Sequence, residues 1–281
     1  MNLGIQTPIP SEIPPVSDID YLNQYLDCVR ASDELNTYCD LGNRLLKAFD
    51  GLKDIIVTVQ KHPGQETLDV LNDLFDNDFH GTLSDETLKE TGRKVMDNLS
   101  KWMNDLVEYL KKFWDRAMIL ITSSNKKLAW LRGRVRMESP KYKIPAWTYK
   151  GVEYQKLRKA IEGSYLVDGT VSSAVAFDTK HDLRATEISV PEGYGAAARI
   201  LDEYAKLDET AVRWRKATDK RVEAAQAAFA KAKANNNVGA ARDQLAAANV
   251  IKSVALSMVM HLNRTIASVL ANCKLVPVES K

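Results

Sequence analysis

The feature that most constrains the fold is an apolar pattern that runs without a proline from Ser84 to about Met137. Its apolar side chains recur at steps of three and four residues, the spacing of one helix face, with a polar interruption at 122–127. A helix of this length would be about 80 Å long at 1.5 Å per residue. A compact core does not need such a helix, so we expect a bundle arm or a coiled-coil seam. The face comprises Leu88, Val95, Leu99, Trp102, Leu106, Tyr109, Phe113, Ala117, Leu120, Leu128, Leu131 and Val135.

A second stretch, residues 18–61, carries the same helical period. It predicts one long helix that begins at Ser17 or Asp18, or two helices broken near 31–33. The sequence His62-Pro63-Gly64 would end it, and a shorter helix is expected over about 66–75. The apolar face of this stretch comprises Leu22, Leu26, Val29, Leu35, Tyr38, Leu41, Leu45, Phe49, Leu52 and Ile56.

The C-terminal part predicts an αα-hairpin. One helical run begins after Glu192-Gly193 and reaches Phe229, and a second run extends to Val269, before Pro277. The turn between them, 235–239, is rich in Asn and Gly, which tolerate positive φ. Alanine dominates near this turn, so we expect the two backbones to approach closely there.

The stretch 139–192 has a different character because Pro140, Pro145 and Pro191 interrupt helices. Its β-branched and aromatic clusters are typical of short strands. We therefore expect a small β or irregular insert at the distal end of the long helices. Strands are expected at 146–149, 173–177 and 186–190, and a small helix at 153–161.

The predicted fold class is mainly α: an elongated bundle of long helices and αα-hairpins with a small β or irregular insert. The predicted parts are an extended, proline-rich arm (1–17), a helical region with the long amphipathic helix (18–138), the insert (139–192) and the C-terminal hairpin on the same bundle (193–276). A frayed terminus is the alternative for the arm.

Charge and cysteine usage narrow the function. The 281 residues include 39 basic and 37 acidic side chains, a net charge of +2, so a generic polyanion binder is not expected. Three cysteines are an odd number, which argues against a disulfide framework and for a reducing compartment. We also expect no secretory signal and no membrane span, because no run approaches about 20 apolar residues.

The sequence contains no motif that nominates a catalytic, cofactor or small-molecule site. The acidic cluster Asp73, Asp76, Asp78 and His80 fails the spacing of a Ca²⁺ loop, so we interpret it as a solvated loop. The segment 192–195 precedes a helix but lacks the lysine of a phosphate loop, so helix capping is the better interpretation. We expect the three tryptophans on helical stretches and the thiols to belong to the core, and we expect no cofactor and no metal.

The best candidate for a binding surface is a basic run with interleaved aromatic residues. Cations that pair with phosphates, beside rings that stack on bases, suit nucleic-acid binding. The alternative is a solvated helix end whose aromatics pack on the insert, and the near-neutral total charge favours this alternative. The basic residues are Lys126, Lys127, Arg132, Arg134, Arg136, Lys141, Lys143 and Lys150, and the aromatic residues are Trp130, Tyr142, Trp147 and Tyr149.

The stretch LSKWMNDLVEYLKKFWDRAMILITSSNKKLAWLRGRVR, residues 99–136, resembles internal head or virion proteins of large tailed bacteriophages. Those proteins carry a Trp/Lys-rich amphipathic helix, a polar Ser/Asn break and a second basic helical stretch, which correspond here to 99–122, 123–125 and 126–136. The resemblance covers about forty residues and no catalytic motif. It implies a non-enzymatic part of the particle, made in the cytoplasm of a bacterial host.

We therefore predict a non-enzymatic helical structural or interaction protein, with a phage virion as its setting. Its expected partners are proteins, including further copies that associate through helical seams, and packaged DNA is a further candidate. One alternative is a nucleic-acid-binding accessory protein that uses the surface 126–150. Another is a membrane-active helical toxin component, in which 250–270 would insert; Lys252, His261 and Arg264 argue against it.

Overall fold

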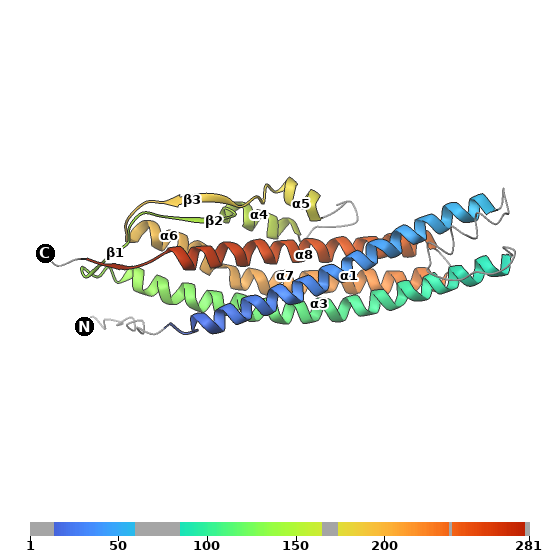
Figure 1. The fold of residues 1–281 in the computed structure, drawn as a ribbon, viewed down its shortest axis with the longest axis horizontal. Helices are drawn as coiled ribbons and strands as arrows, with labels where there is room; N and C mark the ends of the chain where they lie inside the picture. The colour runs from blue at the N-terminus through green and yellow to red at the C-terminus, as the bar shows by residue number, and fades with distance from the viewer. Residues whose placement is uncertain (1–13, 60–84, 165–173, 236–237, 279–281) are drawn as a thin grey trace, which may run out of the picture.

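The computed structural model describes residues 14–59, 85–164, 174–235 and 238–278. The fold is mainly α with a small β component, as the sequence predicts. Long helices lie side by side in an elongated bundle, and a small β and helical layer covers one flank (Figure 1). The long helices are α1 (Asp18–Val59), α3 (Asp85–Arg136), α7 (Leu207–Ala234) and α8 (Val238–Asn272).

Helix α3 is a single helix of 52 residues, which confirms the long helix predicted from Ser84 to about Met137. The polar segment 122–127 does not break it, and two of its side chains, Ser124 and Lys127, find partners on or next to α1. Ser124 is fully buried, and its hydroxyl lies 3.0 Å from the hydroxyl of Tyr21 on α1. The buried face of α3 includes Trp102 and Trp114, which are core residues as expected.

Helix α1 is continuous across 31–33, so the one-helix alternative is correct. Ser17 caps its first turn by accepting a hydrogen bond from the backbone N–H of Asp20 at 3.0 Å. The predicted apolar face is wrong in its N-terminal half, because Leu22 and Leu26 are exposed. Leu35 of the predicted face is buried, and Cys28, which the prediction left out, points into the core as well.

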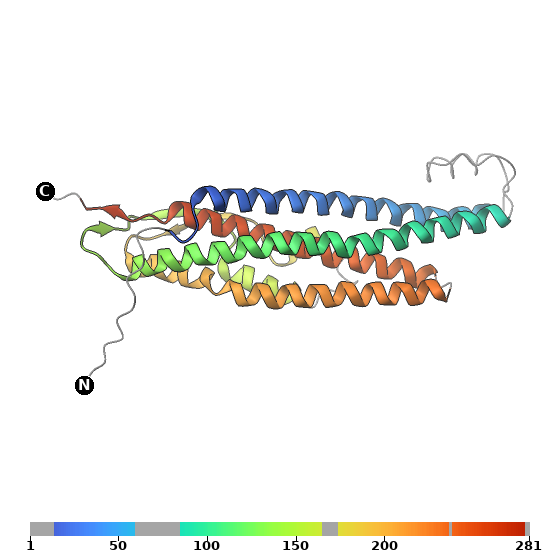
Figure 2. The same ribbon diagram turned by 90° about the horizontal axis from the view of Figure 1, so that it is seen from below.

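The C-terminal αα-hairpin is confirmed, although its first run is two helices. Helix α6 (Tyr194–Ala205) ends at Lys206, and α7 begins at Leu207. Helices α7 and α8 then run antiparallel, and the α1–α3 pair extends beyond their turn (Figure 2). Helix α8 ends at Asn272, five residues before the predicted stop at Pro277.

The insert lies along the flank of α8 rather than at the distal end of the bundle, which corrects its predicted position (Figure 1). The backbone N–H groups of Lys150 and Val152 donate to side-chain oxygens of Ser268 (2.9 Å) and Thr265 (3.1 Å) on α8. These hydrogen bonds fix the strand that ends at Gly151 to the helix. The antiparallel pair is β2 (Trp147–Gly151) with β3 (Thr186–Val190), and α4 (Tyr154–Ser164) and α5 (Ala174–Lys180) lie beside it.

One predicted strand of the insert is wrong. Residues 173–177 were expected to be extended, but Ala174–Lys180 forms helix α5, which buries Phe177 against the core. Tertiary packing decides such a short apolar run, since its period cannot distinguish a strand from a helix. A second short pair, β1 (Tyr142–Lys143) with β4 (Val276–Pro277), lies near the two chain ends.

Three predictions fall outside the described residues. They are the arm over 1–13, the short helix over 66–75, and the acidic cluster of Asp73, Asp76, Asp78 and His80.

Candidate functional site

The predicted basic surface is largely occupied by ion pairs within the chain. Lys127 is only 8% exposed, and its Nζ contacts the carboxylate of Asp18 on α1. Arg132 and Arg136 both contact the carboxylate of Asp202 on α6, the latter at 2.8 Å. Asp18 and Asp202 therefore pair with three of the cations that the sequence placed on one surface and offset two of their three charges.

The aromatic residues of this surface pack on the protein. Trp147 is 8% exposed, and its ring lies 5.6 Å from that of Tyr149. The guanidinium of Arg134 lies 5.3 Å from the centre of the Trp130 ring, a cation–π distance. This arrangement matches the alternative in which the aromatics pack on the insert. Four lysines of the set are exposed: Lys126, Lys141, Lys143 and Lys150.

A cavity of about 390 Å³ does bring some of these residues together, near the end of α3. Lys127, Trp130 and Arg134 line it together with Tyr142 and Lys274. Lys141, Lys143 and Trp147 are not among its lining residues. The structure therefore divides the predicted surface into a small cavity and scattered exposed lysines.

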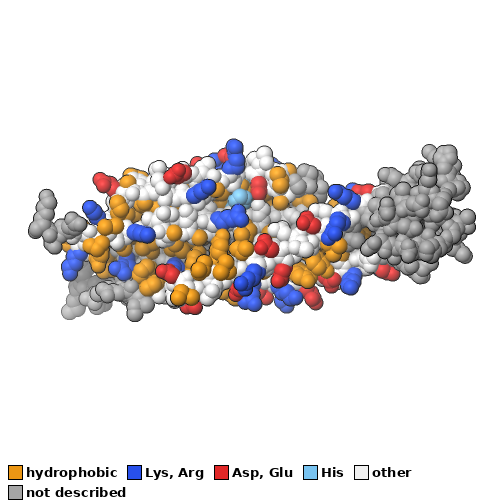
Figure 3. Space-filling model, in the orientation of Figure 1, with side chains coloured by type: hydrophobic (Ala, Val, Ile, Leu, Met, Phe, Trp, Pro, Cys, Tyr) orange, Lys and Arg blue, Asp and Glu red, His pale blue; other side chains and the backbone are white. Residues whose placement is uncertain are grey.

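An apolar stripe that the sequence assigned to the core lies on the surface of α1. Ile19, Leu22 and Leu26 are 73%, 55% and 43% exposed. Hydrophobic side chains gather on this face over the N-terminal half of α1 and the neighbouring part of α8 (Figure 3). Single exposed apolar residues are ordinary, but three on one helix face indicate a contact surface.

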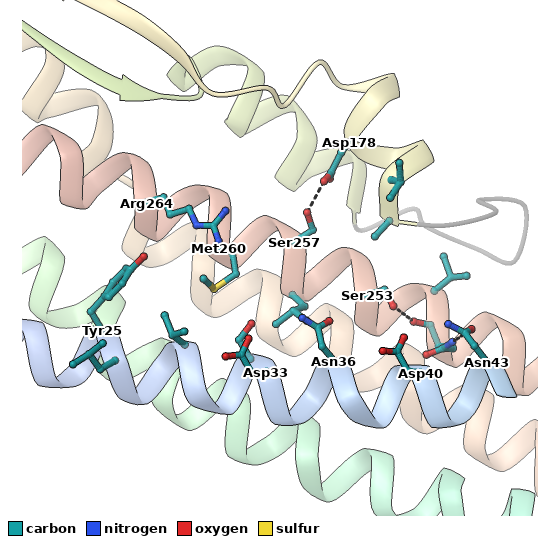
Figure 4. A pocket seen from close by; sticks show the side chains of 18 residues that line it. Tyr25, Asp33, Asn36, Asp40, Asn43, Asp178, Ser253, Ser257, Met260 and Arg264 are labelled. Carbon is teal, nitrogen blue, oxygen red and sulfur yellow. Dashed lines mark hydrogen bonds between the residues drawn. The ribbon is translucent and has the colours of Figure 1, made fainter. Parts of the chain in front are cut away.

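A groove of about 670 Å³ lies between α1 and α8 and beside α5 (Figure 4). Asp33 and Asp40 face it from α1, Asp178 from α5, and Asn249 and Arg264 from α8. This site could not be predicted from the sequence, because its residues come from three distant segments and match no motif. No side-chain spacing within any one segment could have nominated it.

Two residues of the groove, Ser257 and Asp178, form a trio with His261, which lies next to the groove on α8 and lines a separate cavity. The Ser257 hydroxyl donates to Asp178 Oδ2 at 2.6 Å, and His261 Nε2 lies 3.2 Å from the same oxygen. Nucleophilic catalysis by such a trio requires a hydrogen bond from the serine to the histidine. Here both groups contact the aspartate instead, so the trio fastens α5 to α8 and is not arranged as a catalytic triad.

The two buried cysteines, Cys28 and Cys273, are not activated as nucleophiles. Burial raises the pKa of Cys28 and of Cys273 from 9.0 to about 11, so both remain protonated at neutral pH. Nucleophilic cysteines need the thiolate form, which these surroundings disfavour. Among the described residues, no three His, Cys, Asp or Glu side chains lie close enough together to hold a metal ion.

We expect Cys28 and Cys273 to resist thiol reagents until the protein unfolds. In a Cys39→Ser variant, Ellman's reagent at pH 8 should label neither thiol in the folded protein and both after addition of denaturant. The raised pKa also predicts a pH dependence of stability. The contribution of the two protonated thiols to the free energy of unfolding is complete below about pH 9 and is lost as the pH rises toward 11. Rapid labelling of the folded chain would contradict the burial of these thiols.

Comparisons with known proteins identify no relative. No family model matches the chain, and no curated protein or solved structure matches it significantly.

Within the described residues, one helix, Gly239–Asn272, is long and apolar enough to cross a membrane by length and composition. The sequence analysis had expected none. In the structure 61% of the apolar window of this helix is buried, as for the core helix of a bundle.

Proposed function

We propose that this chain is a non-enzymatic structural or interaction protein that self-associates through the outer face of α1. The observation that carries the proposal is the exposure of Ile19, Leu22 and Leu26 on one helix face. Burying apolar surface stabilises an assembly by roughly 25 cal/mol per Å², so a stripe of this kind favours a partner. The elongated bundle gives such a contact a long, regular surface.

The partner we propose is a second copy of the chain, with the two α1 helices antiparallel around a two-fold axis near residue 24. In this register Leu22 lies opposite Leu26 of the second copy. Asp18 then lies opposite Arg30, so opposite charges flank the apolar contact. The side chains of Asp18 and Arg30 are 94% and 76% exposed. Within one chain Asp18 contacts Lys127 and Arg30 lies 3.6 Å from Asp27, so the contact between copies would add to these ion pairs.

The setting we propose is the particle of a large tailed phage, with the chain made in the host cytoplasm. What supports it is the resemblance of residues 99–136 to internal head or virion proteins. Nucleic-acid binding ranks second, because three cations of the basic surface are in ion pairs with Asp18 and Asp202. A membrane-active role ranks third, because α8 contributes most of its apolar window to the core.

The self-association can be tested by light scattering coupled to size exclusion. We expect the wild-type chain to elute as a dimer, and the double variant Leu22→Glu/Leu26→Glu to elute as a monomer because it places four like charges at the contact. Val212→Glu is the matched control, since Val212 is 40% exposed on α7, away from the stripe. The control should remain dimeric.

Two outcomes of this experiment would count against the proposal. One is a wild-type monomer at every concentration, and the other is a dimer that survives the double substitution. Short duplex DNA, added in parallel, should leave the mass unchanged. A shift on DNA that high salt reverses would favour the nucleic-acid alternative.

A further inference from the structure

The groove between α1 and α8 is lined by polar and apolar side chains from both helices. On α1 the residues facing it recur at steps of three and four, and they include Asp33 and Asp40. On α8 the polar ones include Asn249 and Ser257, and Met260 is among the apolar ones (Figure 4). Such a lining suits a ligand that carries both polar and apolar groups. The groove volume of about 670 Å³ is within the range of small-molecule sites.

The lining of the groove is rich in hydrogen-bond acceptors and carries a negative charge. Three aspartates, Asp33, Asp40 and Asp178, face one arginine, Arg264. Arg264 lies at one end of the groove, next to Tyr25, while Asp33 and Asp40 lie along α1 away from it (Figure 4). The greater part of the groove therefore attracts a cation.

Two buried acceptor atoms at the groove have no hydrogen-bond partner. Asn249 is only 5% exposed; its Nδ2 donates to Asn43 Oδ1 at 2.7 Å, but its Oδ1 accepts no hydrogen bond. Asp178 Oδ1 is likewise buried and unpaired, although Oδ2 of the same carboxylate has two partners. A buried acceptor without a partner is unfavourable, so a ligand that donates hydrogen bonds here gains both charge and hydrogen-bond complementarity.

The separation of the carboxylates decides which cation fits. Asp33 and Asp40 are seven residues apart on one helix, about 10 Å along its axis. No three carboxylate, imidazole or thiol groups in the described part of the chain converge on a single point. The site therefore suits charges spread along a chain rather than one metal ion. Val29, Val175 and Val250 also line the groove and provide apolar contacts for methylene groups.

We propose that this groove binds a linear aliphatic polyamine. Its ammonium groups would pair with the aspartates and donate to Asn249 Oδ1 and Asp178 Oδ1, and its methylene segments would lie against the valines. The groove adjoins the proposed contact between copies, because Leu26 belongs to both, but Asp33, Asp40 and Asp178 lie outside that contact.

The test is isothermal titration of the full-length chain with spermidine at about 0.15 M salt, an ionic strength that screens charges beyond about 8 Å. We expect saturation at one spermidine per chain. Asp40→Asn should weaken binding about tenfold, because it removes one carboxylate from an exposed position where folding is not at risk. Glu223→Gln, an equal charge change on the exposed face of α7, is the matched control and should stay within about twofold.

Two further titrations distinguish this site from general attraction of cations. Mg²⁺ at the same ionic strength should not compete, and 1,8-octanediol, which keeps the methylene chain without the charges, should not bind. Asp178→Asn should also weaken spermidine binding, with its fold checked by circular dichroism because Asp178 fastens α5. The proposal is overturned by non-saturating binding, by equal competition from Mg²⁺, or by an effect of Asp40→Asn no larger than that of Glu223→Gln.

Discussion

Replacing Trp114 by alanine is expected to lower the free energy of unfolding by about 3–5 kcal/mol, the usual cost of removing a buried tryptophan. Trp114 is completely buried in the bundle, where its ring meets that of Trp214 edge-on at a centroid distance of 5.0 Å. It also lies 5.6 Å from the ring of Phe113. Truncation therefore leaves a cavity between α3 and α7. Urea denaturation followed by circular dichroism measures the loss.

The matched control is Trp114→Phe. The indole N–H of Trp114 is buried and has no hydrogen-bond acceptor in the structure. Phenylalanine removes this unpaired donor and keeps much of the ring contact, so we expect a cost below about 1.5 kcal/mol. Equal losses for the two variants would contradict the packing described for this pair.

The second large effect is expected from Gly42→Ala, which should cost about 1–3 kcal/mol through overpacking. Gly42 lies on α1 directly against Trp102 of α3, and an added Cβ would lie 2.7 Å from Trp102 Cε2. The indole cannot move aside easily, because it is buried and its Nε1 donates to the Tyr38 carbonyl at 3.0 Å. The same urea denaturation reports the change.

Gly195→Ala is the control for this substitution. Gly195 lies in α6, and a Cβ built there meets no atom within 4 Å. Alanine favours a helix over glycine by roughly 0.8–1 kcal/mol, so this variant should be neutral or more stable than the wild type. If Gly42→Ala behaved in the same way, α1 and α3 would not approach as closely as the structure has them.

The long helices could be predicted from the sequence, because a helix of 52 residues repeats its period many times. The outward face of α1 could not. Leu22 and Leu26 have the spacing of a core stripe, yet Cys28 and Ser32 are the buried residues there. Periodicity finds a helix face but does not say which neighbour it meets. Here α1 packs partly through polar contacts, such as the 2.7 Å hydrogen bond from Tyr38 to Asp105.

The ion pairs of the basic surface could not be predicted for a similar reason. Asp202 lies 66 residues beyond Arg136 in the chain, so the ion pair between them has no signature in the sequence. The groove could not be predicted from the sequence either, because Asp40, Asp178 and Asn249 belong to no recognisable motif in their own segments. Only the packing of α1, α5 and α8 brings them to one cavity.

The central claim is that two copies meet along α1, and a distance between spin labels tests it most directly. In a Cys39→Ser background, single cysteines would replace Asn23, which is exposed beside the proposed two-fold axis, or Val212 on α7. Pulsed electron resonance should then detect a narrow distribution of short distances between copies for the label at Asn23, and no comparably short distance for the label at Val212. No distance between copies at Asn23, or a short one at Val212, would contradict the account.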